Sequence, residues 1–355
     1  MLQGLLERGH DVTMLHRGVH EPVELPDVPH IHADPHFAET LSEATEGRSF
    51  DVVLAMYGRV FAIAQVFAGR CGQLVSIGDV PAYRGCLEPA TVTPYGMAVN
   101  AREDGPLADE AEPVPRFARP IRAAERAVLD RAHQGVFRGT VVRYPPIYGP
   151  RNLVPWEWSV IRRVLDGRTR MILPDDGLGI ISRCAGRNAA EVVLKVVDHP
   201  DVADGQAYNA ADDDQFSIRQ WAEAVSAIMG VRMKFVGLPS ELAGSALVEL
   251  LPPSGRPHIL VDNNKAKREL GYREVIAAAD ALVEAVDWIR RHPVTREDYP
   301  LYPARFDYEA EDRLIAAYTR AVEWVRERAP DVAPQLRHPM PHPKTATVGR
   351  DESGR

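Results

Sequence analysis

The chain has 355 residues, of which 45% are hydrophobic and 26% charged, and its formal net charge is −8. It is long enough for one large domain or two moderate domains with a substantial core, and its composition is that of an ordinary globular protein. The negative charge excludes the electrostatic attraction that draws basic proteins to nucleic acid or anionic membranes, so we expect neither as a partner. No apolar run has the ~18–20 residues of a membrane span.

Cysteine usage and the first residues bear on the cellular compartment. The three cysteines, Cys71, Cys86 and Cys184, are far apart in the sequence. An odd, unclustered set indicates neither a disulfide framework nor a zinc site. The opening residues mix acidic and basic side chains with apolar ones, which is not typical of a signal peptide. We therefore expect a cytoplasmic location.

Strands and helices alternate along residues 1–151. Apolar runs typical of buried parallel strands occur at residues 12–15, 52–54, 74–77 and 140–143. We predict that these four are adjacent parallel strands of one sheet. The stretch "RFARPIRAAERAVL", residues 116–129, predicts a surface helix whose charges at Arg122, Glu125 and Arg126 face water. This alternation predicts an α/β fold with a doubly wound parallel sheet.

The pattern loosens after residue 151. Helices are predicted at residues 154–167, 186–199, 217–230 and 310–328, with a short strand at 206–211. Residues 152–335 therefore form a smaller, mainly helical region, interleaved with the first domain. Residues 336–355 lack apolar periodicity, and we expect them to be disordered.

The order and spacing of these segments resemble the extended short-chain dehydrogenase/reductase family, the NAD-dependent epimerases/dehydratases. The pieces that carry the resemblance are "LLERGHDVTMLHRG", "QLVSIGDVPAYRG", "VVRYPPIYGPR", "YNAADDDQFSIRQWAE" and "DNNKAKRELGYRE". The resemblance implies a Rossmann-like domain, a nicotinamide cofactor, and a small polar or sugar-like substrate bound by the second region. It leaves a homodimer open.

In this family a strand and a Gly-rich turn precede the segment "LLERGHDV", and the turn holds the cofactor pyrophosphate at a helix N-terminus. This sequence begins inside the helix that follows the turn. The Rossmann domain at residues 1–151 is thus expected to be N-terminally incomplete. We expect a missed upstream start rather than a truncated product, and weak or no binding of NAD(P) by the chain as given.

The helix at residues 116–129 departs from the family as well. The resemblance places the catalytic tyrosine at Phe117 and the catalytic lysine at Ile121, and neither residue exchanges protons. None of the five lysines follows a tyrosine by four positions, so the motif is absent in any register. Two interpretations stay open for the pair: it lines the substrate cleft, or it belongs to the core.

Two other residues are candidates for proton transfer. Asp79 stands where the family keeps a serine or threonine, and burial in a cleft would raise its pKa enough for a base. Tyr83 lies at the carboxyl edge of the predicted sheet, where ligands bind in open α/β folds, and would serve as a substitute proton donor. The structural alternatives are a helix or turn cap for the aspartate and packing for the tyrosine.

The resemblance also points to residues that would bind the cofactor. Arg17 follows a strand where the fold meets the adenosine ribose, and a cation there suits the 2′-phosphate of NADP better than NAD. Asp34 resembles the aspartate that meets the adenine in relatives. Tyr144 and Pro145 follow the strand that ends beside the nicotinamide. The alternatives are an exposed arginine, an acidic loop residue and strand-end packing.

Three residues are candidates for substrate binding. Pro146 closes the same strand end, and Arg183 and Arg187 fall where relatives carry polar residues that contact the substrate. A guanidinium there would hold an anionic group through a bidentate contact. The alternative for the arginines is a solvated position near a helix start.

A group of histidines raises the question of a metal. His30, His32 and His36 lie close to Asp34, and His30 and His32 share one face only if the segment is a strand. The spacing of a zinc site is not evident. We therefore interpret the segment as a polar junction between a strand and a loop, and predict no metal.

Three hypotheses about function follow. The first is a divergent oxidoreductase of the epimerase/dehydratase type with non-standard catalytic residues. The second is a catalytically silent Rossmann-fold protein that binds a nucleotide or a partner. The third is an inactive, truncated gene product.

Overall fold

The computed structural model describes residues 1–18, 25–56, 59–110, 114–243, 258–295 and 306–330. Residues Met1–Glu311 form one compact unit and Asp312–Arg355 form a second. The boundary predicted after residue 151 falls inside the first unit. From the sequence, we expect the regions on either side of this boundary to interleave. The tail predicted to be disordered, residues 336–355, lies outside the described residues.

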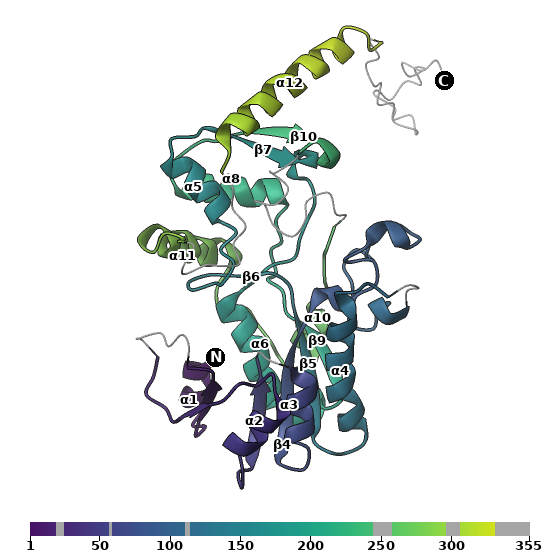
Figure 1. Ribbon diagram of the computed structural model, residues 1–355, viewed down its shortest axis with the longest axis vertical. Helices are drawn as coiled ribbons and strands as arrows, with labels where there is room; N and C mark the ends of the chain where they lie inside the picture. The colour runs from purple at the N-terminus through teal and green to yellow at the C-terminus, as the bar shows by residue number, and fades with distance from the viewer. Residues whose placement is uncertain (19–24, 57–58, 111–113, 244–257, 296–305, 331–355) are drawn as a thin grey trace, which may run out of the picture. The chain divides into compact units, whose positions relative to one another are not determined.

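The central sheet is built from four parallel strands, β3 (Phe50–Ala55), β4 (Cys71–Asp79), β5 (Arg138–Tyr144) and β9 (Gln206–Asn209). Their spatial order is β3-β4-β5-β9. The structure confirms that the runs at residues 52–54, 74–77 and 140–143 are adjacent strands of one sheet, and the fold class is α/β as predicted (Figure 1).

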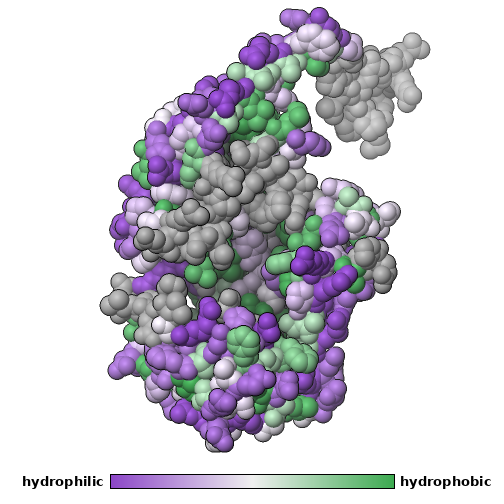
Figure 2. All heavy atoms as spheres, in the orientation of Figure 1, coloured by the Kyte–Doolittle hydropathy of each residue, from purple (hydrophilic) through white to green (hydrophobic). Residues whose placement is uncertain are grey.

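Helices cover both faces of this sheet. Successive residues of a strand point to opposite sides, and in these strands both sets of side chains include apolar residues that must be covered. Val75 and Val142 pack with residues of α1 (Leu2–Glu7), α6 (Gly186–Asp198) and α10 (Asn264–Glu269). Leu74 and Val141 pack on the other side with residues of α2 (Ala38–Ala44), α3 (Val60–Val66) and α4 (Ala118–His133). On the face shown in Figure 2, many hydrophilic side chains cover this part of the molecule, with hydrophobic ones among them.

The prediction was wrong for residues 12–15, which do not join the central sheet. The strand there, β1 (Met14–His16), pairs in parallel with β2 (His30–His32), and the two form a separate ladder. In a doubly wound sheet the first strand of the motif lies between the second and the fourth. No strand among the described residues occupies that place, so the hydrogen bonding of one ladder ends at β1 and that of the other at β3.

A further core contains α5 (Trp158–Leu165), α8 (Ile218–Ile228) and α11 (Ala278–Arg291), which pack together, and it also takes in buried residues from before residue 151, such as Tyr83 and Tyr148. Two short parallel pairs accompany it: β7 (Arg170–Pro174) with β10 (Lys234–Leu238), and β6 (Ile147–Tyr148) with β8 (Cys184–Ala185). The sequence did not predict the pairing of β7 with β10. The other α-helices of the described residues are α7 (Pro200–Ala203) and α12 (Tyr308–Arg326). Within the described ranges, no helix has the length and apolarity needed to cross a membrane.

Candidate functional site

The carboxyl ends of β4 and β5 bring Asp79 beside Tyr144, its register partner across the two strands. Asp79 is half-buried. Burial, opposed by a backbone hydrogen bond and reinforced by the nearby Glu125 carboxylate, raises its pKa to about 6. A carboxyl group with this pKa is mostly ionised at neutral pH and is still basic enough to accept a proton. This placement agrees with the role predicted for Asp79 without testing it.

Tyr83, the other predicted proton donor, is only 1% exposed. Its hydroxyl donates to Oδ1 of Asn209 at 2.7 Å, and the Arg143 guanidinium lies 4.7 Å from the centre of its ring. Burial raises the pKa of Tyr83 to about 12. A hydroxyl that is enclosed and engaged in this way favours the structural alternative, in which Tyr83 packs behind the sheet edge.

A buried ionic network that the sequence pattern did not predict lies behind the sheet edge. Glu125 accepts hydrogen bonds from Arg143, Nε to Oε1 at 2.9 Å and Nη2 to Oε2 at 3.1 Å, and also pairs with Arg122. Arg122 donates in turn to Asp109 at 2.8 Å. Glu125 and Arg122 are buried rather than water-facing, which corrects the surface assignment for these two side chains.

Glycine at position 78 of β4 helps α4 approach the sheet at this point. A Cβ there would lie 3.1 Å from Oε1 of Glu125 and 2.8 Å from Cγ1 of Val141. The sequence did contain a signal for this network. Arg143 lies within an apolar run typical of a buried strand, and a buried arginine requires an acidic partner, which the preceding helix could supply.

The two family positions on α4 lack proton-transferring groups and differ in burial. Phe117, immediately before the helix, is 62% exposed, whereas Ile121 is half-buried. The exposure of Phe117 argues against its assignment to the core.

We expect Phe117→Tyr to change the melting temperature by less than about 1 °C, because the added hydroxyl stays in water. Ile121→Lys should cost no more than about 1 kcal/mol, since a lysine at a half-buried helix position extends its ammonium to solvent. Thermal unfolding without ligand measures both. A loss of several kcal/mol for Ile121→Lys would place Ile121 in the core and contradict a cleft-lining role.

Tyr144, the last residue of β5, and the two prolines that follow it make contacts within the fold. The Tyr144 hydroxyl donates to the Ala189 carbonyl at 3.0 Å, and burial raises the pKa of Tyr144 far above its usual value. Pro145 is buried, and the carbonyl of half-buried Pro146 accepts from the Cys184 amide at 3.2 Å. These contacts join the end of β5 to α6 and β8, so strand-end packing accounts for all three residues. Their cofactor and substrate roles stay predictions.

Arg17 and Asp34 follow β1 and β2, and the structure brings them near each other. Asp34 accepts from the His36 amide at 3.0 Å and contacts Nδ1 of its ring at 2.7 Å. These hydrogen bonds, chiefly the backbone one, hold the pKa of Asp34 below its usual value, and the charge of Arg17 adds to the effect. Exposed Arg17 thus remains available to a phosphate or ribose.

A nicotinamide dinucleotide fits these residues only at its adenosine end. Arg17 and Asp34 offer a cation and an acceptor there. At the other end, Phe117 and Ile121 offer no polar group for the ribose, and the Tyr144 hydroxyl already donates to Ala189. Among the described residues no Gly-rich turn is present for the pyrophosphate. Among the described residues, donors suited to a dinucleotide are therefore confined to its adenosine end.

A second polar cluster is formed in the region after residue 151 by Arg183, Glu157 and Trp221. All three side chains are buried, and the Arg183 guanidinium lies 4.3 Å from the ring centre of Trp221. Arg183 Nη2, Glu157 Oε2 and Trp221 Nε1 have no hydrogen-bond partner among the described residues. Burial lowers the pKa of Arg183 to about 10 and raises that of Glu157 to about 7.

Buried polar atoms without partners cost about 1–3 kcal/mol each, so this cluster is suited to a polar ligand or to ordered water. Arg187, by contrast, lies on the surface and pairs with Glu284 of α11 at 3.0 Å. Of the two predicted substrate arginines, only Arg183 is buried; the substrate-binding role of both stays a prediction.

The fold and the sheet edge define a doubly wound α/β protein with ligand-binding potential at the carboxyl ends of its strands. Comparison with known proteins refines this class: the chain has the fold of the extended short-chain dehydrogenases/reductases, the NAD-dependent epimerases/dehydratases. No protein-family model and no curated protein matches the sequence.

The similar solved structures include a UDP-glucose 4-epimerase from Thermotoga maritima with UDP-glucose, at 16% identity and a TM-score of 0.61, covering 82% of this chain and 94% of that one. A dTDP-glucose 4,6-dehydratase from Streptomyces venezuelae with NAD and TYD gives 16% and 0.59, with 83% and 93% covered. A UDP-glucuronic acid 4-epimerase from Bacillus cereus with UDP-glucuronic acid and NAD gives 15% and 0.61, with 82% and 95% covered. At these identities the likeness concerns the fold.

Proposed function

We propose that this chain is a divergent oxidoreductase of the epimerase/dehydratase type that acts on a small polar or sugar-like substrate, with Asp79 as the proton-transferring group. The observation that carries the proposal is the position and pKa of Asp79. It is a half-buried carboxyl group at the carboxyl end of a central parallel strand, with a pKa raised to about 6. Ligands of open α/β sheets bind at this edge.

The substrate class rests on Arg183 and on the fold. One nitrogen of this enclosed guanidinium has no hydrogen-bond partner among the described residues, and such a group is suited to an anionic oxygen, as in a phosphate or carboxylate. Two of the similar structures contain nucleotide sugars, UDP-glucuronic acid and UDP-glucose, which are polar, anionic molecules of this kind. Nucleotide sugars are therefore the first substrates to test, with NADP preferred over NAD because of Arg17.

Asp79→Asn should lower kcat/KM by about 10²–10⁴-fold, because the amide cannot take a proton from the substrate. In the unmodified protein the rate should rise with pH through about 6, as Asp79 ionises, and this limb should vanish in the variant. The measurement is conversion of UDP-glucose, UDP-glucuronic acid and dTDP-glucose, each with NADP and NAD, followed by chromatography of the products. Nicotinamide absorbance is recorded as well, since it changes only if the reaction is a net oxidation or reduction.

Asp51→Asn is the matched control, because Asp51 is an exposed carboxylate on the neighbouring strand β3. Binding of NADPH, followed by its fluorescence, is recorded in parallel and should be weak. Turnover that survives Asp79→Asn with an unchanged pH profile would remove Asp79 from the mechanism.

A catalytically silent binding protein is the second candidate. The observation that favours it is α4, where the family positions hold an exposed phenylalanine and a half-buried isoleucine, and where the charged side chains Arg122 and Glu125 serve a buried structural network. Nucleotide binding without turnover of any of the three nucleotide sugars would support it over the first candidate.

A further inference from the structure

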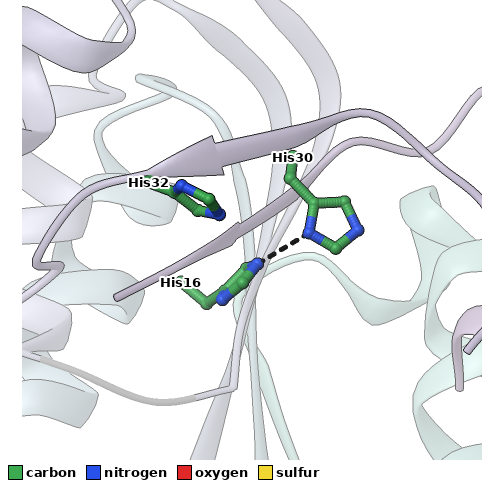
Figure 3. Close-up of side chains that lie close together, drawn as sticks. All are labelled: His16, His30 and His32. Carbon is green, nitrogen blue, oxygen red and sulfur yellow. Dashed lines mark hydrogen bonds between the residues drawn. The ribbon is translucent and has the colours of Figure 1, made fainter. Parts of the chain in front are cut away.

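Three histidines come together on the small ladder formed by β1 and β2. His16 lies directly opposite His32, and His30 lies opposite Met14, two residues before His16. Because side chains two positions apart on a strand share a face, His30 and His32 point to the same side as His16. Figure 3 shows the three imidazoles converging on this side of the ladder.

The distances between the rings are close to those of metal ligands. His16 Nε2 and His30 Nδ1 are 2.8 Å apart, and one ring nitrogen from each of the three histidines lies within 4.8 Å of the other two. Two nitrogens that bind one zinc ion tetrahedrally at 2.0–2.1 Å are separated by about 3.3 Å. Small rotations about the side-chain bonds therefore suffice to place an ion among the three rings.

The local chemistry suits a metal ion of the zinc class. Imidazole nitrogen is a ligand for zinc and related divalent transition metals, and three histidines leave a coordination position for water. His30 and His32 are exposed and His16 is half-buried, so an ion reaches the group from solvent. His16 Nδ1 accepts from the Gly18 amide at 3.1 Å. Binding through Nε2 moves the ring proton to Nδ1, and this hydrogen bond is given up.

This set of histidines differs from the set considered in the sequence analysis, which contained His36 instead of His16. His36 is held by Asp34, through its amide and its ring. His16, which is fourteen positions before His30, enters only because β1 and β2 pair in parallel. The backbone ladder fixes His16 opposite His32. This pairing holds the side chains near each other before an ion binds, which is not the case for histidines on a flexible surface segment.

We propose that His16, His30 and His32 bind one divalent metal ion of the zinc class. The ion joins two strands of three residues each and thereby stabilises the ladder that precedes Arg17 and Asp34. This inference does not depend on the catalytic proposal for Asp79.

The test uses the full chain without an affinity tag, titrated with Co²⁺ and then with Zn²⁺ as competitor. We expect the visible absorption bands of a four-coordinate Co²⁺ ion, their loss on addition of Zn²⁺, and a rise in melting temperature with Zn²⁺. His30→Gln should weaken binding at least about tenfold and abolish the thermal shift.

His36→Gln is the matched control, since His36 is close in sequence but paired with Asp34, and it should bind as the unmodified chain does. The chain also carries His338 and His342, so the stoichiometry is taken from the difference between the unmodified chain and His30→Gln. All these histidine variants should retain the melting temperature of the metal-free protein. Equal binding by His30→Gln and His36→Gln, or a Co²⁺ spectrum unchanged by His30→Gln, would overturn the proposal.

Discussion

Replacing Glu125 with alanine is expected to lower the free energy of unfolding by about 3–5 kcal/mol. Glu125 is 1% exposed and accepts two hydrogen bonds from Arg143, which is itself buried. Removing the carboxylate leaves the charge of Arg143 enclosed without its partner, and this costs more than the pair itself contributes. Urea unfolding followed by circular dichroism measures the loss.

Glu284→Ala is the control for this prediction. Glu284 also pairs with an arginine, Arg187 at 3.0 Å, but both side chains are exposed. An exposed pair of this kind contributes about 0–1 kcal/mol. If Glu125→Ala and Glu284→Ala had similar effects, the interior network of α4 and β5 would not exist as described.

The stability of the protein is expected to fall as the pH rises from about 4.5 to about 7, because of Glu157. Burial raises the pKa of this carboxyl group from 4.5 to about 7 in the folded protein. Between these two pH values the folded state keeps a proton that the unfolded state releases. The free energy of unfolding therefore decreases as the pH rises. The decline from Glu157 is on the order of 3 kcal/mol across this window. Asp79 adds a smaller decline in the same direction, since its pKa is also raised.

Glu157→Gln isolates this contribution, because the amide has nearly the same shape and does not titrate. Melting temperatures measured at intervals between pH 4 and pH 8 should decline less in the variant than in the unmodified protein. The two curves should converge at the acidic end, where Glu157 is protonated in both states. Parallel curves would show that Glu157 is ionised inside the protein or that it is not buried.

Ligand binding offers a second way to measure the protonation of Glu157. An anionic molecule that binds Arg183 lies near Glu157 and favours its protonated form by like-charge repulsion. The pH dependence of ligand binding and that of stability therefore report on one carboxyl group.

The sequence by itself determined the α/β class and most of the central sheet. Runs such as Val52–Leu54 and Leu74–Ile77 are apolar on both faces, and only a sheet covered on both sides satisfies such runs. The order of strands and helices also sufficed for the resemblance to the epimerase/dehydratase fold, which the solved structures bear out. Positions at strand ends, such as Asp79 and Arg17, follow from the same pattern.

Only the tertiary structure decided how individual polar side chains are used. Periodicity assigned Arg122 and Glu125 to the water-facing side of a helix, but β5 brings Arg143 against them, and the buried charges satisfy one another. His16 joins His30 and His32 through a strand pairing that depends on backbone hydrogen bonds, which carry no signature in the side chains. Local sequence determines where helices and strands form. Contacts between residues far apart along the chain determine which side chains become the partners of these arginines, glutamates and histidines.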